Sequence, residues 1–213
     1  MTAPGVVLLV GATGPLAPAL QERLAEEGYG FLAAAQAREV PGLVAELPEG
    51  GHPVAAVFQA PPVAEGALDA VSAEAMIAAL DDALAEAGVA ARALVAARPE
   101  APTARIVMVA DWAITGPARE TVAAAVSGGL VGLARSWALE FAPLGVTVNA
   151  VIAGPESLLA EDAVLPLAGP LAARPKPEHV AHAVACFLDP RAAAISGQVL
   201  SVCGGRTPGS IPV

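Results

Sequence analysis

Short uncharged runs of aliphatic residues alternate with longer alanine- and leucine-rich stretches along this chain, and this alternation constrains its fold most. Residues 6–10 (VVLLV) are entirely apolar, which is typical of a strand buried on both faces. A glycine-rich turn and a helical pattern over residues 16–27 follow directly. Strands that alternate with helices form parallel βαβ units with right-handed crossovers. The sequence therefore predicts an α/β fold with an open, doubly wound parallel sheet covered by helices on both faces.

The same patterns place the individual elements along the whole chain. Strands are predicted at residues 6–10, 31–36, 54–59, 105–110, 146–152 and 198–203. Helices are predicted at residues 16–27, 72–97, 117–141 and 177–188, the second with a break near Gly88. No internal repeat or long linker divides the chain, so we expect residues 1–213 to form a single domain.

Composition excludes several classes of function. A net charge of −10 argues against binding to nucleic acid or to an anionic membrane. The longest uncharged runs, such as residues 121–134, are too short and too glycine-rich to span a bilayer. The N-terminus lacks the pattern of a secretory signal, so a cytoplasmic location is expected. Cys186 and Cys203 are interpreted as buried apolar residues rather than as a disulfide.

Three segments in the second half of the chain carry a family resemblance. They are residues 129–151 (GLVGLARSWALEFAPLGVTVNAV), 177–184 (PEHVAHAV) and 195–205 (ISGQVLSVCGG). Together they resemble the helices and strands that follow the catalytic lysine in short-chain dehydrogenases/reductases, although that family usually has Asp where Cys203 stands. The resemblance implies a Rossmann-like fold, shortened here between the second strand and the strand at 54–59. It also implies an NAD(P)-dependent oxidoreductase ancestry.

The catalytic residues of that family are absent. Its enzymes use a Tyr-x-x-x-Lys motif, but the single tyrosine and the single lysine, Tyr29 and Lys176, lie far apart in the sequence. Alignment on the matched helix places the family's tyrosine at Ala123, its lysine at Ser127 and its catalytic serine at Ala110. Alanine cannot exchange a proton with a substrate, and serine carries no charge that could lower the pKa of a tyrosine. The resemblance therefore implies a degenerate member without the usual catalytic groups.

The cofactor positions are also altered. The candidate cofactor-binding residues, taken as vestigial or weak, are Gly11, Thr13, Gly14, Leu16, Arg38 and Ala60. The turn at Gly11 and Gly14 has the position of a pyrophosphate-binding loop, and it is equally consistent with a simple strand–helix turn. Pro15 stands where the family has a glycine, and proline offers no N–H to a phosphate. Arg38 could meet a 2′-phosphate or be a surface residue, so we expect either no NAD(P) or weak binding.

Other polar groups offer no complete alternative site. Asp111 and Ser127 lack an intervening histidine for nucleophilic catalysis. His179 and His182 have the spacing of half a metal site, but no further ligand completes it, so no metal is expected.

Three functions remain open. The favoured one is a non-catalytic subunit that forms a homo- or hetero-oligomer with a relative of the same family, through the helix at 117–141 and the segment at 177–203. The alternatives are an atypical NAD(P)-dependent oxidoreductase acting on a carbonyl or an alcohol, and a nucleotide-binding sensor.

Overall fold

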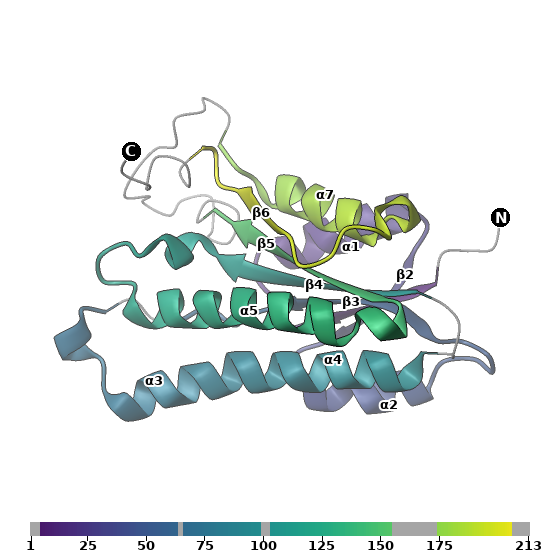
Figure 1. Ribbon diagram of the computed structural model, residues 1–213, viewed down its shortest axis with the longest axis horizontal. Helices are drawn as coiled ribbons and strands as arrows, with labels where there is room; N and C mark the ends of the chain where they lie inside the picture. The colour runs from purple at the N-terminus through teal and green to yellow at the C-terminus, as the bar shows by residue number, and fades with distance from the viewer. Residues whose placement is uncertain (1–4, 64–65, 99–102, 155–173, 206–213) are drawn as a thin grey trace.

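The computed structural model describes residues 5–63, 66–98, 103–154 and 174–205. Within them, six strands form one sheet in the order β2-β1-β3-β4-β5-β6, and every neighbouring pair is parallel (Figure 1). The strands are β1 (Val6–Val10), β2 (Gly30–Ala34), β3 (Pro53–Gln59), β4 (Ala104–Asp111), β5 (Val146–Ala153) and β6 (Val199–Val202). The predicted doubly wound parallel sheet is confirmed.

Helices cover both faces of the sheet (Figure 1). One face carries α1 (Leu16–Glu26) and α7 (Pro177–Leu188), and the other carries α2 (Val40–Ala45), α4 (Glu86–Ala97) and α5 (Thr121–Glu140). Alternate residues of each strand serve the two cores: Val7 and Leu9 pack with α1, whereas Leu8 and Val10 pack on the opposite side. Burial on both faces explains why these strands are apolar without alternation.

The connection from β2 to β3 is short. Every residue from 35 to 52 is described, and this stretch contains the 3₁₀ turn η1 (Ala37–Glu39) and α2 but no strand. As a result β2 is an outer strand of the sheet. The expected shortening before β3 is therefore confirmed. The sequence did not predict α2, because Pro41 and Gly42 are residues that usually interrupt a helix. Here the proline lies in the first turn, where a helix tolerates it.

The helix predicted at 72–97 is continuous, but not regular. It begins as α3 (Ala73–Leu80), where the Ser72 hydroxyl accepts the Ala75 N–H at 3.1 Å. It passes through a π-helical turn, η3 (Asp81–Ala85), before α4. The irregularity therefore lies before Gly88 and not at it.

The helix α5 begins at Thr121, four residues later than predicted. Arg119 has φ +70°, a left-handed conformation that a helix cannot include, and it separates Pro117 from the helix. At 20 residues, α5 is the described helix that is long and apolar enough to span a membrane. Its Val126, Leu130 and Ala134 are nevertheless buried against the sheet, as in the core helix of a globular domain.

Candidate functional site at the carboxyl edge of the sheet

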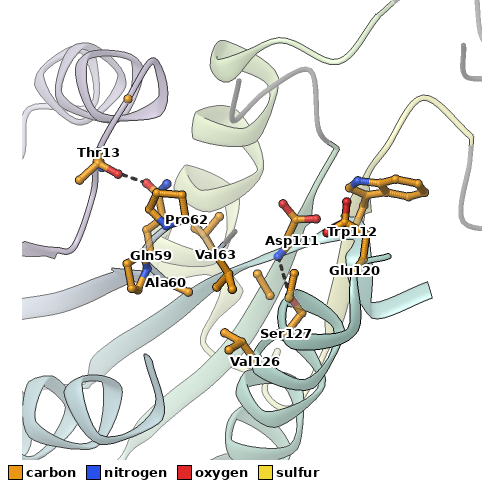
Figure 2. Close-up of a pocket in the computed structure, with 15 residues that line it drawn as sticks. Thr13, Gln59, Ala60, Pro62, Val63, Asp111, Trp112, Glu120, Val126 and Ser127 are labelled. Atoms are coloured by element: carbon orange, nitrogen blue, oxygen red, sulfur yellow. Dashed lines mark hydrogen bonds between the residues drawn. The ribbon is translucent and has the colours of Figure 1, made fainter. Parts of the chain in front are cut away.

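A cleft of about 390 Å³ opens at the carboxyl ends of β3 and β4 and beside the first half of α5. The carboxyl edge of an open parallel sheet is where ligands of such folds bind. The described residues that line the cleft are Thr13, Gly14, Gln59, Ala60, Pro61, Pro62, Val63, Val109, Ala110, Asp111, Trp112, Glu120, Ala123, Val126 and Ser127. Figure 2 shows Thr13 and Gln59 at one end and Trp112 with Glu120 at the other.

The three positions that alignment assigned to catalysis meet in this cleft. Ala110 lies near the end of β4, and Ala123 and Ser127 lie one helical turn apart on α5. Ser127 is 2% exposed, and its hydroxyl accepts the Asp111 N–H at 3.1 Å (Figure 2). The hydroxyl thus ties α5 to the end of β4, and the two alanines present only methyl groups to a ligand.

The polar groups at the end of β4 also serve the backbone. The Asp111 carboxylate accepts the Ala113 N–H at 2.8 Å and so caps the 3₁₀ turn η4 (Trp112–Thr115). Arg119, which lies just before α5, is exposed, and its carbonyl accepts the Gly66 N–H at 2.8 Å. Among the described lining residues, the charged side chains are Asp111 and Glu120, both acidic. The cleft therefore offers no positive charge from those residues to an anionic ligand.

The glycine-rich turn after β1 lies directly against the end of β3. Gly11 has φ +70°, and a Cβ on it would stand 2.4 Å from the carbonyl oxygen of Gln59, so only glycine fits there. The Thr13 N–H donates to the Gln59 side-chain oxygen, Oε1, at 3.3 Å. Of the residues predicted to hold a cofactor, Thr13, Gly14 and Ala60 line the cleft. The Leu16 side chain is instead fully buried in the core beneath α1.

The end of β2 is occupied by carboxylates. Arg38 is exposed on η1 and is not among the described residues that line the cleft. Glu39 accepts the Ala35 N–H at 3.0 Å, and Glu86, from α4, accepts the Ala37 N–H. The two negative charges of Glu39 and Glu86 at this edge disfavour the binding of a 2′-phosphate, whichever way the Arg38 side chain points.

The described residues therefore disfavour the 2′-phosphate of NADP, whereas a carboxylate at the end of β2 is compatible with the ribose hydroxyls of NAD. The turn donor at Thr13 is already bonded, Pro15 and Pro18 carry no N–H, and the charges near β2 and in the cleft are negative. The remaining feature that favours an anion is the N-terminus of α1, whose first turn holds no acidic residue.

Comparison with known proteins decides the family. A sequence model of the family described as "Enoyl-(Acyl carrier protein) reductase" matches residues 54–207, most of the chain. The chain belongs to the short-chain dehydrogenase/reductase family. The expected ancestry is thereby confirmed.

Two curated relatives in this family come from Thauera aromatica. Subunit BbsC of (2S)-[(R)-hydroxy(phenyl)methyl]succinyl-CoA dehydrogenase is 37% identical over 134 residues, which cover 61% of this chain and 54% of the relative. Subunit BbsD of that dehydrogenase is 33% identical over 110 residues, covering 48% and 44%. The chain thus spans about half the length of the curated relatives that it matches.

Solved short-chain dehydrogenase/reductase structures share the fold. A Serratia marcescens member has a TM-score of 0.80 at 22% identity, covering 95% of this chain and 97% of its own. A single-residue variant of actinorhodin polyketide ketoreductase with NADPH also has a TM-score of 0.80, at 24% identity and the same coverage. At these identities the likeness shows the fold alone.

The single tyrosine, lysine and asparagine of the chain lie away from the cleft. The Tyr29 hydroxyl donates to the Leu188 carbonyl at 3.1 Å, and burial raises the pKa of this tyrosine above its ordinary value. Lys176 is exposed immediately before α7. Asn149 is buried in β5, where its Nδ2 donates to the Ile195 carbonyl and its Oδ1 accepts the Gln198 N–H. All three are outside the described lining of the cleft.

Histidine and cysteine form no metal centre within the described ranges, where no three His, Cys, Asp or Glu side chains gather. Instead, His179 Nδ1 accepts the Lys176 N–H at 3.0 Å, and His182 Nε2 lies 3.9 Å from Cys186 Sγ. Cys203 is buried as expected. Cys186 is exposed, so its expected burial is wrong: it lies on the solvent face of α7.

Sequence reasoning missed Gln59, Glu39 and Glu86. Gln59 follows an apolar run at the end of a strand facing the glycine turn, which was a usable signal for a residue of the site. The hydrogen bond between the Ala37 N–H and the Glu86 carboxylate joins residues far apart in the sequence, and no local pattern indicates it.

Proposed function

We propose that this chain is a catalytically inactive short-chain dehydrogenase/reductase subunit, a structural or regulatory partner of an active dehydrogenase or ketoreductase. The observation that carries the proposal is the meeting of Ala110, Ala123 and Ser127 in one cleft. A positioned general acid is worth on the order of 10²–10⁴ in rate, and the family's tyrosine position holds a methyl group. The Ser127 hydroxyl accepts the Asp111 N–H, and no lysine or histidine stands among the described lining residues to activate it.

The named relatives support assembly with another subunit. BbsC and BbsD are both named as subunits of one dehydrogenase, and this chain is similar to each. By analogy, this chain would pair with a relative that retains the Tyr-x-x-x-Lys motif. A cytoplasmic location, no nucleic acid and no membrane partner belong to the same proposal, consistent with the net charge of −10.

The surface of α5 suits a helix–helix interface. Gly128, Gly132 and Ser136 follow one another at four-residue spacing and are exposed, and Leu139 on the same helix is 80% exposed. Small residues on one side of a helix allow another helix to approach closely, and a large exposed leucine gains most from being covered. The region of 177–203 adds β6, an outer strand whose Leu200 is 43% exposed. These are the segments that we propose as interfaces.

The presence of the cleft supports a second candidate function. A space of about 390 Å³ is large enough for a small ligand, so the chain could act as a sensor that binds without turnover. An atypical NAD(P)-dependent oxidoreductase is less well supported, because the described lining residues include no tyrosine, lysine or histidine to act as general acid toward a carbonyl.

The proposal is tested by native mass spectrometry of the protein purified gently from its own host. We expect a hetero-oligomer with an intact family member, whose carbonyl reduction is lost when the partner's motif tyrosine is changed to phenylalanine. The matched change in this chain's cleft, Asp111→Asn, should leave the turnover of the complex unchanged. Reduction of a carbonyl by this chain purified alone would contradict the proposal.

A further inference from the structure

The donor at the centre of the glycine turn is already satisfied from within the protein. Thr13 N–H points to Gln59 Oε1 at 3.3 Å, and Figure 2 shows the glutamine side chain extended from the end of β3 toward the turn. Backbone N–H groups of a turn between a strand and a helix are the donors that bind a phosphate oxygen. A neutral amide oxygen of the protein here takes the position of such an oxygen.

The glutamine is held firmly in this place. Its backbone is fixed in the centre of the sheet, where Gln59 pairs with Val109 of β4, and its residue exposure is 7%. Gly11 lies so close to the Gln59 carbonyl that not even a Cβ fits between them. The turn and the strand end are therefore in direct contact, and the side chain needs no rearrangement to reach Thr13.

Three of the neighbouring residues cannot replace Thr13 as a donor. The Gly11 N–H donates to the Ala34 carbonyl at 3.0 Å, and Pro15 and Pro18 have no N–H. The positive end of the α1 dipole remains at the turn, and a carbonyl-type oxygen such as Gln59 Oε1 benefits from it. A phosphate would have to expel a buried amide and leave it without this partner.

We infer that Gln59 is a specificity-determining residue that excludes phosphate groups from the glycine turn by acting as its internal ligand. The inference deepens the proposed function, because it gives a physical reason for a subunit that keeps the turn and loses the cofactor. One hydrogen bond of this kind corresponds to about a tenfold difference in affinity.

The test compares Gln59→Met with the wild-type chain. Methionine keeps the length and apolar stem of glutamine but accepts no comparable hydrogen bond. We expect inorganic pyrophosphate and NADPH to bind about tenfold more tightly to the variant, measured by calorimetry and by NADPH fluorescence. The exchange of the Thr13 amide hydrogen, followed by NMR, should also become about tenfold faster.

Two further variants guard the interpretation. Gln59→Asn keeps the amide but withdraws it by one methylene, so it should show the same gain even if the methionine variant folds poorly. Gln198→Met makes the same substitution at an exposed site and should behave as the wild type. If neither Gln59 variant binds pyrophosphate more tightly, or if the exchange at Thr13 is unchanged, the inference is overturned.

Failure of this inference is distinguishable from failure of the proposed function. The binding measurements use the purified chain with neither partner nor carbonyl substrate. Carbonyl reduction by the chain alone would contradict the proposed role as an inactive subunit. An unchanged affinity of the Gln59 variants for pyrophosphate would contradict only the inference that Gln59 is the internal ligand of the turn.

Discussion

The two edges of the sheet differ in whether their buried polar side chains have hydrogen-bond partners. At the carboxyl edge, Gln59 holds Thr13 and Ser127 holds Asp111, each through one hydrogen bond between a side chain and the backbone. At the amino edge, Arg105 and Thr147 lie side by side on β4 and β5, 6% and 9% exposed. The Nε atom of Arg105 and the Oγ1 atom of Thr147 have no hydrogen-bond partner in the described protein.

This contrast bears on the proposed absence of catalysis at the edge where the family does its chemistry. Catalytic sites usually retain unsatisfied or strained polar groups, because those groups are kept for the substrate. Here the groups at the carboxyl edge support the fold, and unsatisfied atoms lie at the opposite edge, about the length of a strand away. Hydrogen bonds from Gln59, Ser127 and Asp111 to the backbone are consistent with the proposed supporting subunit.

The largest expected effect tests the amino edge. Arg105→Met removes a buried guanidinium with an unpartnered Nε and keeps most of its apolar stem, so stability should rise by about 1–2 kcal/mol. Urea unfolding measures the change. Arg105→Ala, which also removes the stem, should gain less. If the methionine variant is less stable than the wild type, Arg105 is satisfied in solution and the contrast between the edges fails.

A smaller effect tests the carboxyl edge. Ser127→Ala leaves the Asp111 N–H without its acceptor, so we expect a loss of about 1 kcal/mol in the free energy of unfolding. Thermal unfolding followed by circular dichroism is suitable. Ser136→Ala, at an exposed position of the same helix, is the matched control and should change stability by less than about 0.5 kcal/mol. Equal effects at the two serines would show that the cleft hydroxyl does not support the fold.

The outer face of α5 can be tested independently of the cleft. A Cβ on Gly128 meets no atom within 4 Å, so Gly128→Ala should stabilise the isolated subunit by about 0.5–1 kcal/mol through helix propensity. If this face is an interface, the same methyl group should weaken association, measured by analytical ultracentrifugation. Gly129→Ala differs, because its Cβ would stand 2.9 Å from the methyl groups of Leu84. A Gly128 variant with unchanged association would place the interface elsewhere.

The smallest effect concerns an exposed pair beyond α7. Hydrogen bonds from Arg191 lower the pKa of Asp189 to about 2. Since the folded pKa lies below the ordinary value of about 3.9, the stabilisation is present above that value and is lost as pH falls through about 2. Arg191→Gln should return the pKa toward 3.9 in an NMR titration. An unchanged pKa would show that this pair does not form in solution.

Local pattern was sufficient for most elements of the fold. The bounds of β1 and α7 match the prediction, because an apolar run followed by glycine and a proline-initiated amphipathic helix are strong signals. The start of α5 was misplaced because the left-handed conformation of Arg119 has no signature in its residue type. The π-helical turn was missed for a related reason: it brings Leu84 against Gly129, a contact between distant residues.

The sequence by itself determined that the chain folds as a doubly wound sheet, and it predicted that the family's proton donor is missing, since both follow from residue types in order. Only the tertiary structure decided which residues come together in the cleft. Ala110, Ala123 and Ser127 come together only when β4 packs on α5, and Gln59 reaches Thr13 only when β1 lies beside β3. Hydrogen bonds between residues far apart in the chain depend on those packed distances, which no local pattern encodes.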